Sequence, residues 1–126
     1  MDAFTSPAIE KLTLDVTKQD TIDKVVKTII EKEGRIDVLV NNAGVLCAGE
    51  HYLSRCHHQP VILTCMILGP VIEVPMDVVE RTFDTNVFSI IRMCRAVIPH
   101  MAARKTGTIV NISSVTARVY VSPLPF

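Results

Sequence analysis

Apolar residues recur with two different periods along the first part of the chain. Residues 9–16 alternate apolar and polar side chains, which predicts a β-strand. From residue 22 to residue 30 the apolar positions lie three and four apart, which predicts a helix with one buried face. Thr17 can cap this helix and Gly34 can end it. The nearly continuous apolar run over residues 36–40 then predicts a strand covered on both faces, as in a parallel sheet.

The second half predicts two helices and a further strand. A short helix is expected over residues 76–84, a long one over 86–104, and a buried strand over 108–112. Strands that alternate with helices predict an α/β fold with a parallel sheet of about three strands and flanking helices. Ligands bind beyond the carboxyl ends of such strands. The carboxyl ends of all three predicted strands carry polar or small residues, namely Asp15, residues 41–44 and residues 113–114.

Composition narrows the class of protein. The chain has 126 residues, 48% of them hydrophobic, so it can bury a core and is at most one domain. Its 13 basic and 13 acidic residues cancel, so we expect no nucleic-acid partner. We expect no transmembrane segment, no signal peptide and reduced cysteines, hence a cytoplasmic location. Cysteines and histidines near Cys56 lack the paired spacing of zinc ligands, so no metal site is assigned.

Four motifs in order resemble the short-chain dehydrogenase/reductase family. They are Leu14-Asp15-Val16, Asn41-Asn42-Ala43-Gly44, Asn86 within DTNVF, and the run TIVNISSV that contains Ser114. The resemblance covers about residues 9–49 and 70–126. The runs VLCAG, PVIEVP and VSPLPF look most like fungal NADPH-dependent reductases of the 1-acyldihydroxyacetone-phosphate type.

The resemblance implies a partial Rossmann domain over residues 1–126, with an incomplete doubly wound parallel sheet, that binds NADP(H) or NAD(H). Asp15 would accept a hydrogen bond from the adenine amino group, and Val16 would supply a backbone contact. The adenosine ribose would be lined by Asn42, Ala43 and Gly44. Two residues would take part in catalysis. Ser114 would bind the oxygen of a small carbonyl substrate, and Asn86 would hold a water through its main chain. Asn41 would tie neighbouring strands together.

Three parts of the family pattern are absent from this sequence. None of the five glycines forms the T-G-x-x-x-G-x-G turn that holds the pyrophosphate. The second strand of the family is also missing, and so is the Tyr-x-x-x-Lys pair, because Leu124 lies four residues after Tyr120. We therefore expect a chain cut at both ends. It would be a fragment of a carbonyl reductase, inactive or nearly so by itself.

The resemblance also leads to an expectation about partners and one about location. The family helix that begins near Asn86 packs against another subunit, so residues 86–104 could pair two copies or bind a full-length reductase without catalysis. The finer resemblance adds the endoplasmic reticulum or lipid droplets as a second location.

Residues 50–69 depart from the family spacing. Gly44 and Asn86 are 42 positions apart, and removing these twenty residues leaves 22, which matches the family. Two origins are open, a translated intron and a lid-like insertion near the cofactor. The codons for Gly49-Glu50 and Leu68-Gly69 can form splice-site sequences, which favours the intron.

Sequencing the transcript separates these two origins. A translated intron predicts a mature message that lacks codons 50–69, because splicing would remove them. Abundant messages that retain these codons in every growth state would support the insertion instead.

Overall fold

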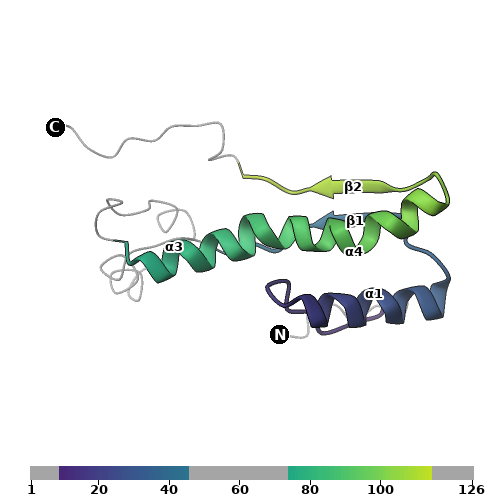
Figure 1. Cartoon of the computed structure of the whole chain (residues 1–126), viewed down its shortest axis with the longest axis horizontal. Helices are drawn as coiled ribbons and strands as arrows, with labels where there is room; N and C mark the ends of the chain where they lie inside the picture. The colour runs from purple at the N-terminus through teal and green to yellow at the C-terminus, as the bar shows by residue number, and fades with distance from the viewer. Residues whose placement is uncertain (1–8, 46–73, 115–126) are drawn as a thin grey trace.

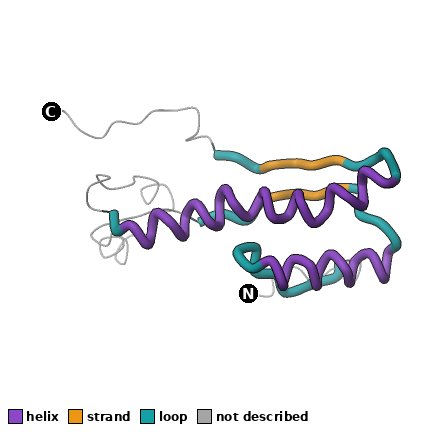
Figure 2. Tube along the Cα trace, viewed as in Figure 1, coloured by secondary structure: helices purple, strands orange, loops and turns teal. Residues whose placement is uncertain are grey.

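The computed structural model of the protein describes residues 9–45 and 74–114, in which helices alternate with strands (Figures 1 and 2). In chain order the elements are α1 (Gln19–Glu33), β1 (Val38–Asn41), α3 (Met76–Phe83), the π-helical segment η3 (Asp84–Phe88), α4 (Ser89–Ala103) and β2 (Thr108–Asn111). The predicted helix over 22–30 and the predicted strands over 36–40 and 108–112 are confirmed. Residues 50–69, the predicted insertion, lie outside the described part.

The two strands pair in parallel, as the sequence predicts. Val38 lies opposite Thr108, and Asn41 lies opposite Asn111. The Ile112 amide donates to the Asn41 carbonyl at 2.9 Å, so the pairing extends to the carboxyl end of both strands. Helix α4, which lies between the two strands in the sequence, runs antiparallel to them along the sheet (Figure 1). A connection that returns to the starting end of the sheet in this way is what parallel pairing requires. The carboxyl ends of β1 and β2 therefore lie side by side at one end of the sheet.

The predicted strand over residues 9–16 is wrong. The backbone there is irregular and leads into a turn at residues 16 and 17. A strand needs a neighbouring strand for its backbone hydrogen bonds, and the sheet of the described residues consists of β1 and β2. Leu14 instead packs against the core, and Glu10 pairs with Lys32 at the far end of α1. The alternation of apolar and polar side chains over residues 9–16 thus belongs to an irregular segment that packs against the core through Leu14 and does not join the sheet.

Helix α1 ends as its sequence predicts. Gly34 follows the last turn with a φ of 74°, a left-handed conformation that glycine adopts without steric cost. Its amide donates to the Ile30 carbonyl at 2.9 Å and so satisfies one of the last carbonyls of the helix. Asp20 in the first turn and Lys32 in the last turn have the signs that the helix dipole favours.

A small apolar core joins α1, α4 and β1. Its buried members are Ile22 and Val26 of α1, Leu39 of β1, and Val97 and Met101 of α4. Along β1 the side chains alternate between buried and exposed. The helices therefore cover one face of the sheet, whereas Val38 and Val40 on the other face are more than half exposed.

The helical stretch from Met76 to Ala103 is continuous, with a wider turn inside it. Its α-helical parts, α3 and α4, confirm the two predicted helices. The π-helical η3 joins them, and the Ser89 amide there donates to the carbonyl of Asp84, five residues back. The sequence pattern did not predict this segment.

The turn from α4 to β2 is packed closely. A β-carbon on Gly107 would lie 2.5 Å from the sulfur of Met101, so a larger residue would push against the core. Arg104 donates from Nη2 to the Ile36 carbonyl at 2.8 Å, and from Nη1 to Asp37 at 3.2 Å. These contacts hold the end of α4 against the start of β1.

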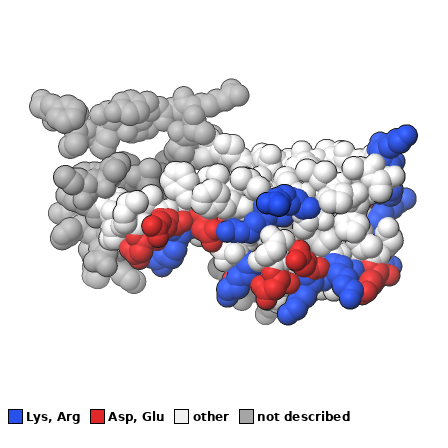
Figure 3. All heavy atoms as spheres, in the orientation of Figure 1, with Lys and Arg blue, Asp and Glu red and all other residues white. Residues whose placement is uncertain are grey.

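Charged side chains mark the solvent faces of the helices. In Figure 3 acidic and basic residues alternate over α1 and gather near α3, while the surface over the strands is white. In the described ranges 9–45 and 74–114, no helix has the length and apolar character that a membrane span needs.

Replacing Ile22 with alanine should destabilise the fold much more than replacing Ile98. Ile22 is 0% exposed and Ile98 is 45% exposed, so the same change leaves a cavity at the first position only. We expect Ile22→Ala to lower the free energy of unfolding by about 2–5 kcal/mol. Ile98→Ala should cost less than about 1 kcal/mol. Urea unfolding followed by circular dichroism measures both, and equal losses would contradict the assignment of the core.

Candidate functional site

The residues predicted after the two strands lie at one end of the sheet. The carboxyl ends of β1 and β2 meet there, and the turn before α1 lies at the same end (Figure 1). Asn42, Ala43 and Gly44 follow β1 directly and are exposed. Ser114 lies three residues beyond β2 and is also exposed. The residues predicted after β1 and those predicted after β2 therefore follow neighbouring strand ends, whereas Asp15 belongs to the turn before α1.

Asp15 holds together the turn that leads into α1. Its Oδ1 accepts hydrogen bonds from the Thr17 amide at 3.0 Å and from the Thr17 hydroxyl at 2.7 Å. Its Oδ2 lies 3.2 Å from Lys18 Nζ. The Asp15 carbonyl accepts from the Lys18 amide at 3.1 Å and from the Thr21 hydroxyl at 2.5 Å. The carboxylate is therefore fixed from several sides, and Val16 is half-buried in the turn beside it.

Thr17 does not cap α1, which corrects the expectation from the sequence. The N-cap position is Lys18, which makes no side-chain cap. The Thr17 hydroxyl donates to Asp15 instead, because an aspartate two residues earlier offers a charged acceptor for a local turn.

The Asp15 carboxyl group is more acidic than usual. Hydrogen bonds from the Thr17 hydroxyl, then from its amide and from Lys18, lower the pKa of Asp15 below its ordinary value. A lowered pKa keeps the carboxylate ionised at neutral pH. Its stabilising contacts are present above the ordinary pKa and are lost as the pH falls through the lowered one.

Asn41 links the two strands, as expected. Its Nδ2 donates to the side-chain oxygen of Asn111 at 2.8 Å, across the last pair of the sheet. Cys94 Sγ from α4 lies 3.9 Å from the same nitrogen. This buried amide therefore fixes the rim from which residues 42–44 depart.

The Asn86 side chain makes two hydrogen bonds to the loop that follows β1. Its Oδ1 accepts from the Val45 amide at 2.7 Å, and its Nδ2 donates to the Val45 carbonyl at 2.8 Å. A β-carbon on Gly44 would lie 3.4 Å from Asn86 Oδ1, so the loop passes directly beside this side chain. The side-chain amide thus holds the segment of residues 42–45 in a fixed path.

The π-helical segment places Asn86 for this contact. At the start of α4, the Ser89 hydroxyl donates back to the Thr85 carbonyl of η3 at 2.5 Å. Arg92 donates to the Asp84 carbonyl at 3.3 Å and to its carboxylate at 2.5 Å. These bonds occupy carbonyls in and around the wide turn, which stabilises a conformation that is otherwise rare.

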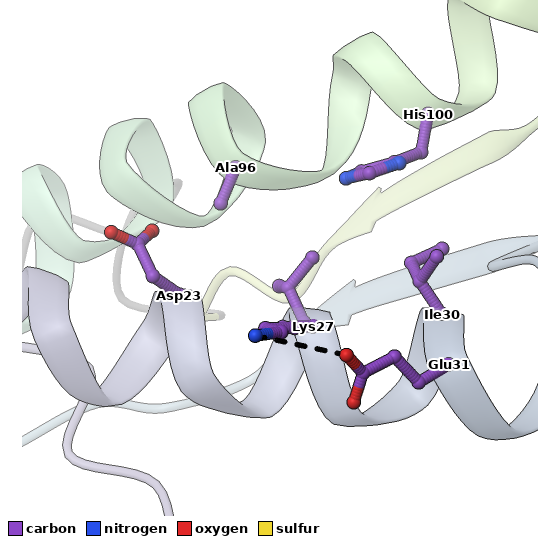
Figure 4. A pocket seen from close by; sticks show the side chains of 7 residues that line it. Asp23, Lys27, Ile30, Glu31, Ala96 and His100 are labelled. Atoms are coloured by element: carbon purple, nitrogen blue, oxygen red, sulfur yellow. Dashed lines mark ion pairs between the residues drawn. The ribbon is translucent and has the colours of Figure 1, made fainter.

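A separate hollow lies between α1 and α4 (Figure 4). It has a volume of about 280 Å³ and is lined by Val26, Ile30 and Ala96, with charged and polar groups around them. Lys27 and Glu31 form an ion pair of 3.7 Å across its α1 side (Figure 4). None of the residues that the sequence predicts for the site lines it. The hollow is therefore distinct from the rim of the strands.

The residues at the rim fit the adenosine half of a nicotinamide cofactor. Asp15 offers an ionised acceptor for an amino group, and residues 42–44 are exposed directly after β1. Neither the sequence nor the described structure provides a glycine-rich turn for the pyrophosphate. The fit is therefore confined to one half of such a cofactor.

Sequence analysis missed several contacts of this site. The threonine two residues after Asp15 is a signal for a local turn and could have been recognised. The hydrogen bonds of Asn86 to Val45 have no such signal in the sequence, because the fold brings together residues that are far apart in the chain. The ion pair of Arg92 with Asp84 has none either, because it depends on the π-helical turn between them.

Known proteins give consistent matches. The family model described as short chain dehydrogenase matches residues 3–125. A 3-ketodihydrosphingosine reductase of Bacteroides thetaiotaomicron is 34% identical over 107 residues, which are 85% of this chain and 32% of that protein. The NADPH-dependent 1-acyldihydroxyacetone phosphate reductase of Schizosaccharomyces pombe is 29% identical, over 94% of this chain and 33% of that protein.

A solved structure, ElxO with NADP bound, matches 93% of this chain with a TM-score of 0.67 and 29% sequence identity. The match covers 38% of that structure, so the chain spans about a third of the length of its relatives. With most of its length matched by the family model, and with the family's α/β fold, the chain belongs to the short-chain dehydrogenase/reductase family.

Proposed function

We propose that this chain carries the adenosine side of the cofactor site and the substrate-binding serine of an NAD(P)(H)-dependent reductase that converts a carbonyl to an alcohol. The observation that carries the proposal is the pair of hydrogen bonds between the Asn86 side chain and the Val45 backbone. This contact holds residues 42–44 in place beyond the carboxyl end of β1, and Ser114 follows the paired strand β2. A fixed loop of small residues at the carboxyl ends of parallel strands is where such folds bind nucleotides.

Each residue has a role in this proposal. Asp15 accepts a hydrogen bond from the adenine amino group, and Val16 contributes a backbone contact beside it. Asn42, Ala43 and Gly44 line the adenosine ribose. Ser114 donates a hydrogen bond to the carbonyl oxygen of the substrate, which stabilises the negative charge that develops there. Asn86 holds a water through its main chain, and its side chain positions the loop.

A nicotinamide nucleotide would supply the hydride in this chemistry. The choice between NADP(H) and NAD(H) is open, and ElxO, a structural relative, is described with NADP bound. For the substrate we propose a ketone. An acyl-dihydroxyacetone-phosphate is one candidate, since a relative from Schizosaccharomyces pombe is named for it. We place this reaction in the cytoplasm.

We further propose that the 126 residues form a partial Rossmann domain with an insertion at 50–69. The sequence offers no glycine-rich turn and no Tyr-x-x-x-Lys pair. Hydride transfer needs a held cofactor and a proton donor, so this chain alone should not turn over.

The purified chain should fail to oxidise NADPH in the presence of ketones. The missing pyrophosphate turn and proton donor are the physical reason. Absorbance of the nicotinamide, followed with a panel of ketones, measures this, and an intact family member serves as the positive control. Turnover clearly above the rate without protein would refute the proposed inactivity.

A second candidate function rests on the exposed face shared by the end of η3 and α4. Phe88, Ile91 and Ile98 are each about half exposed, and they recur at the three- and four-residue spacing of one helix face, together with Arg95. Such an exposed stripe can pack against another helix. We propose that it pairs with a full-length reductase of the family or with a second copy of this chain.

Replacing Ile91 with aspartate should abolish this pairing. A charge in the middle of the stripe would have to be desolvated on binding, which costs far more than any contact it makes. Co-purification with an intact family reductase, and sedimentation for the second copy, measure the effect. Met76→Asp is the matched control, because Met76 is exposed on α3 outside the stripe. Equal binding by both variants would exclude this surface.

A further inference from the structure

The Asp15 carboxylate has little acceptor capacity left for a ligand. A carboxylate offers about four lone-pair positions, two on each oxygen. Thr17 occupies Oδ1 with both its amide and its hydroxyl, at 3.0 and 2.7 Å. Lys18 Nζ lies against Oδ2 at 3.2 Å. Oδ2 is therefore the atom that can accept from a ligand, and Lys18 already shares it.

We propose that Lys18 competes with the amino group of a bound purine for Asp15 Oδ2 and thereby sets the affinity of the adenosine site. This inference rests on the proposed function, because it concerns the same carboxylate. It adds a residue that controls affinity from the edge of the site. Lys18 need not touch the ligand to do so.

The pair is exposed enough for such competition. The side chain of Lys18 is 66% exposed and that of Asp15 is 43% exposed. Ion pairs at such positions are weak, since water screens them and the lysine loses side-chain entropy. A ligand can therefore displace Lys18 without exposing a buried charge, and the displaced ammonium group returns to water.

Thr17 acts as the positioning residue for this exchange. Its two hydrogen bonds hold one carboxylate oxygen and so fix the direction of the other. The main chain is fixed as well, since the Asp15 carbonyl accepts from the Lys18 amide and from Thr21. The exposed side chain of Lys18 is therefore the partner of the carboxylate that a ligand can displace.

The chemistry of Oδ2 also selects the ligand. The exocyclic amino group of adenosine can donate to a carboxylate oxygen. Inosine carries an oxo group at the same place, and two acceptors facing each other repel. The site should therefore favour adenosine over inosine, most clearly when Lys18 is absent, because a lysine could otherwise donate to the oxo group.

Titration of the isotopically labelled chain with adenosine, followed by NMR, tests this proposal. Adenosine is uncharged, so loss of the lysine cannot act through attraction to a phosphate. Lys18→Met should bind adenosine about two- to five-fold more tightly than the wild type, the range that an exposed ion pair allows. Lys18→Arg should keep the wild-type affinity. Lys24→Met, which removes an exposed lysine elsewhere on α1, is the matched control.

Salt gives a second readout that a structural role would not change. Screening weakens the Lys18–Asp15 pair, so adenosine should bind the wild type more tightly as salt rises, while Lys18→Met should respond little. In a separate pH titration followed by NMR, the pKa of Asp15 should be higher in Lys18→Met than in the wild type, because a favourable cation is removed.

Each remaining outcome is informative. If Lys18→Met binds adenosine no better than Lys24→Met does, the inference is overturned while the adenosine site of the proposed function stands. If neither the wild type nor any variant binds adenosine, the adenosine site of the proposed function fails together with the inference.

Discussion

The parallel pairing of β1 and β2 is the constraint on which the rest of the structure depends. Parallel strands can be joined only by a return across the sheet, and α4 makes this return with Val97 and Met101 buried beneath it. The same two residues meet Ile22 and Val26 of α1, so one small core fixes both helices and the sheet. Because both strands then end at the same place, residues far apart in the chain gather at a single rim.

Polar side chains fix the backbone around the carboxyl ends of the strands, where the candidate site lies. Asn41 joins the strands through Asn111, and Asn86 holds the loop after β1 by both atoms of its amide. Asp15 shapes the turn before α1 in a similar way. In each case a side chain satisfies backbone or amide groups that no regular element reaches. This organisation explains why small and polar residues occur at the strand ends, where a core would require apolar ones.

The regular elements could be predicted from the sequence, whereas the local exceptions could not. The apolar spacing of α1, the left-handed Gly34 and the apolar runs of both strands are local signals, and the structure agrees with them. The alternation of apolar and polar side chains over residues 9–16 led to a wrong strand prediction. A strand depends on a neighbouring strand, which the period of the sequence does not reveal. The π turn and the hydrogen bonds of Asn86 to Val45 were missed for the same reason. The roles proposed for Ser114 and residues 42–44 came from family resemblance and stay predictions.

The wide turn of η3 has a consequence for how length can vary in this region. Successive residues of an α-helix are rotated by about 100°, so one residue gained or lost rotates everything before it relative to everything after it. The five-residue spacing from Ser89 back to Asp84 accommodates an additional residue without unwinding the helix. Deleting one residue from DTNVF would restore an ordinary helix and turn Asn86 away from its loop. A family member of altered length here would need a different way to hold the strand end.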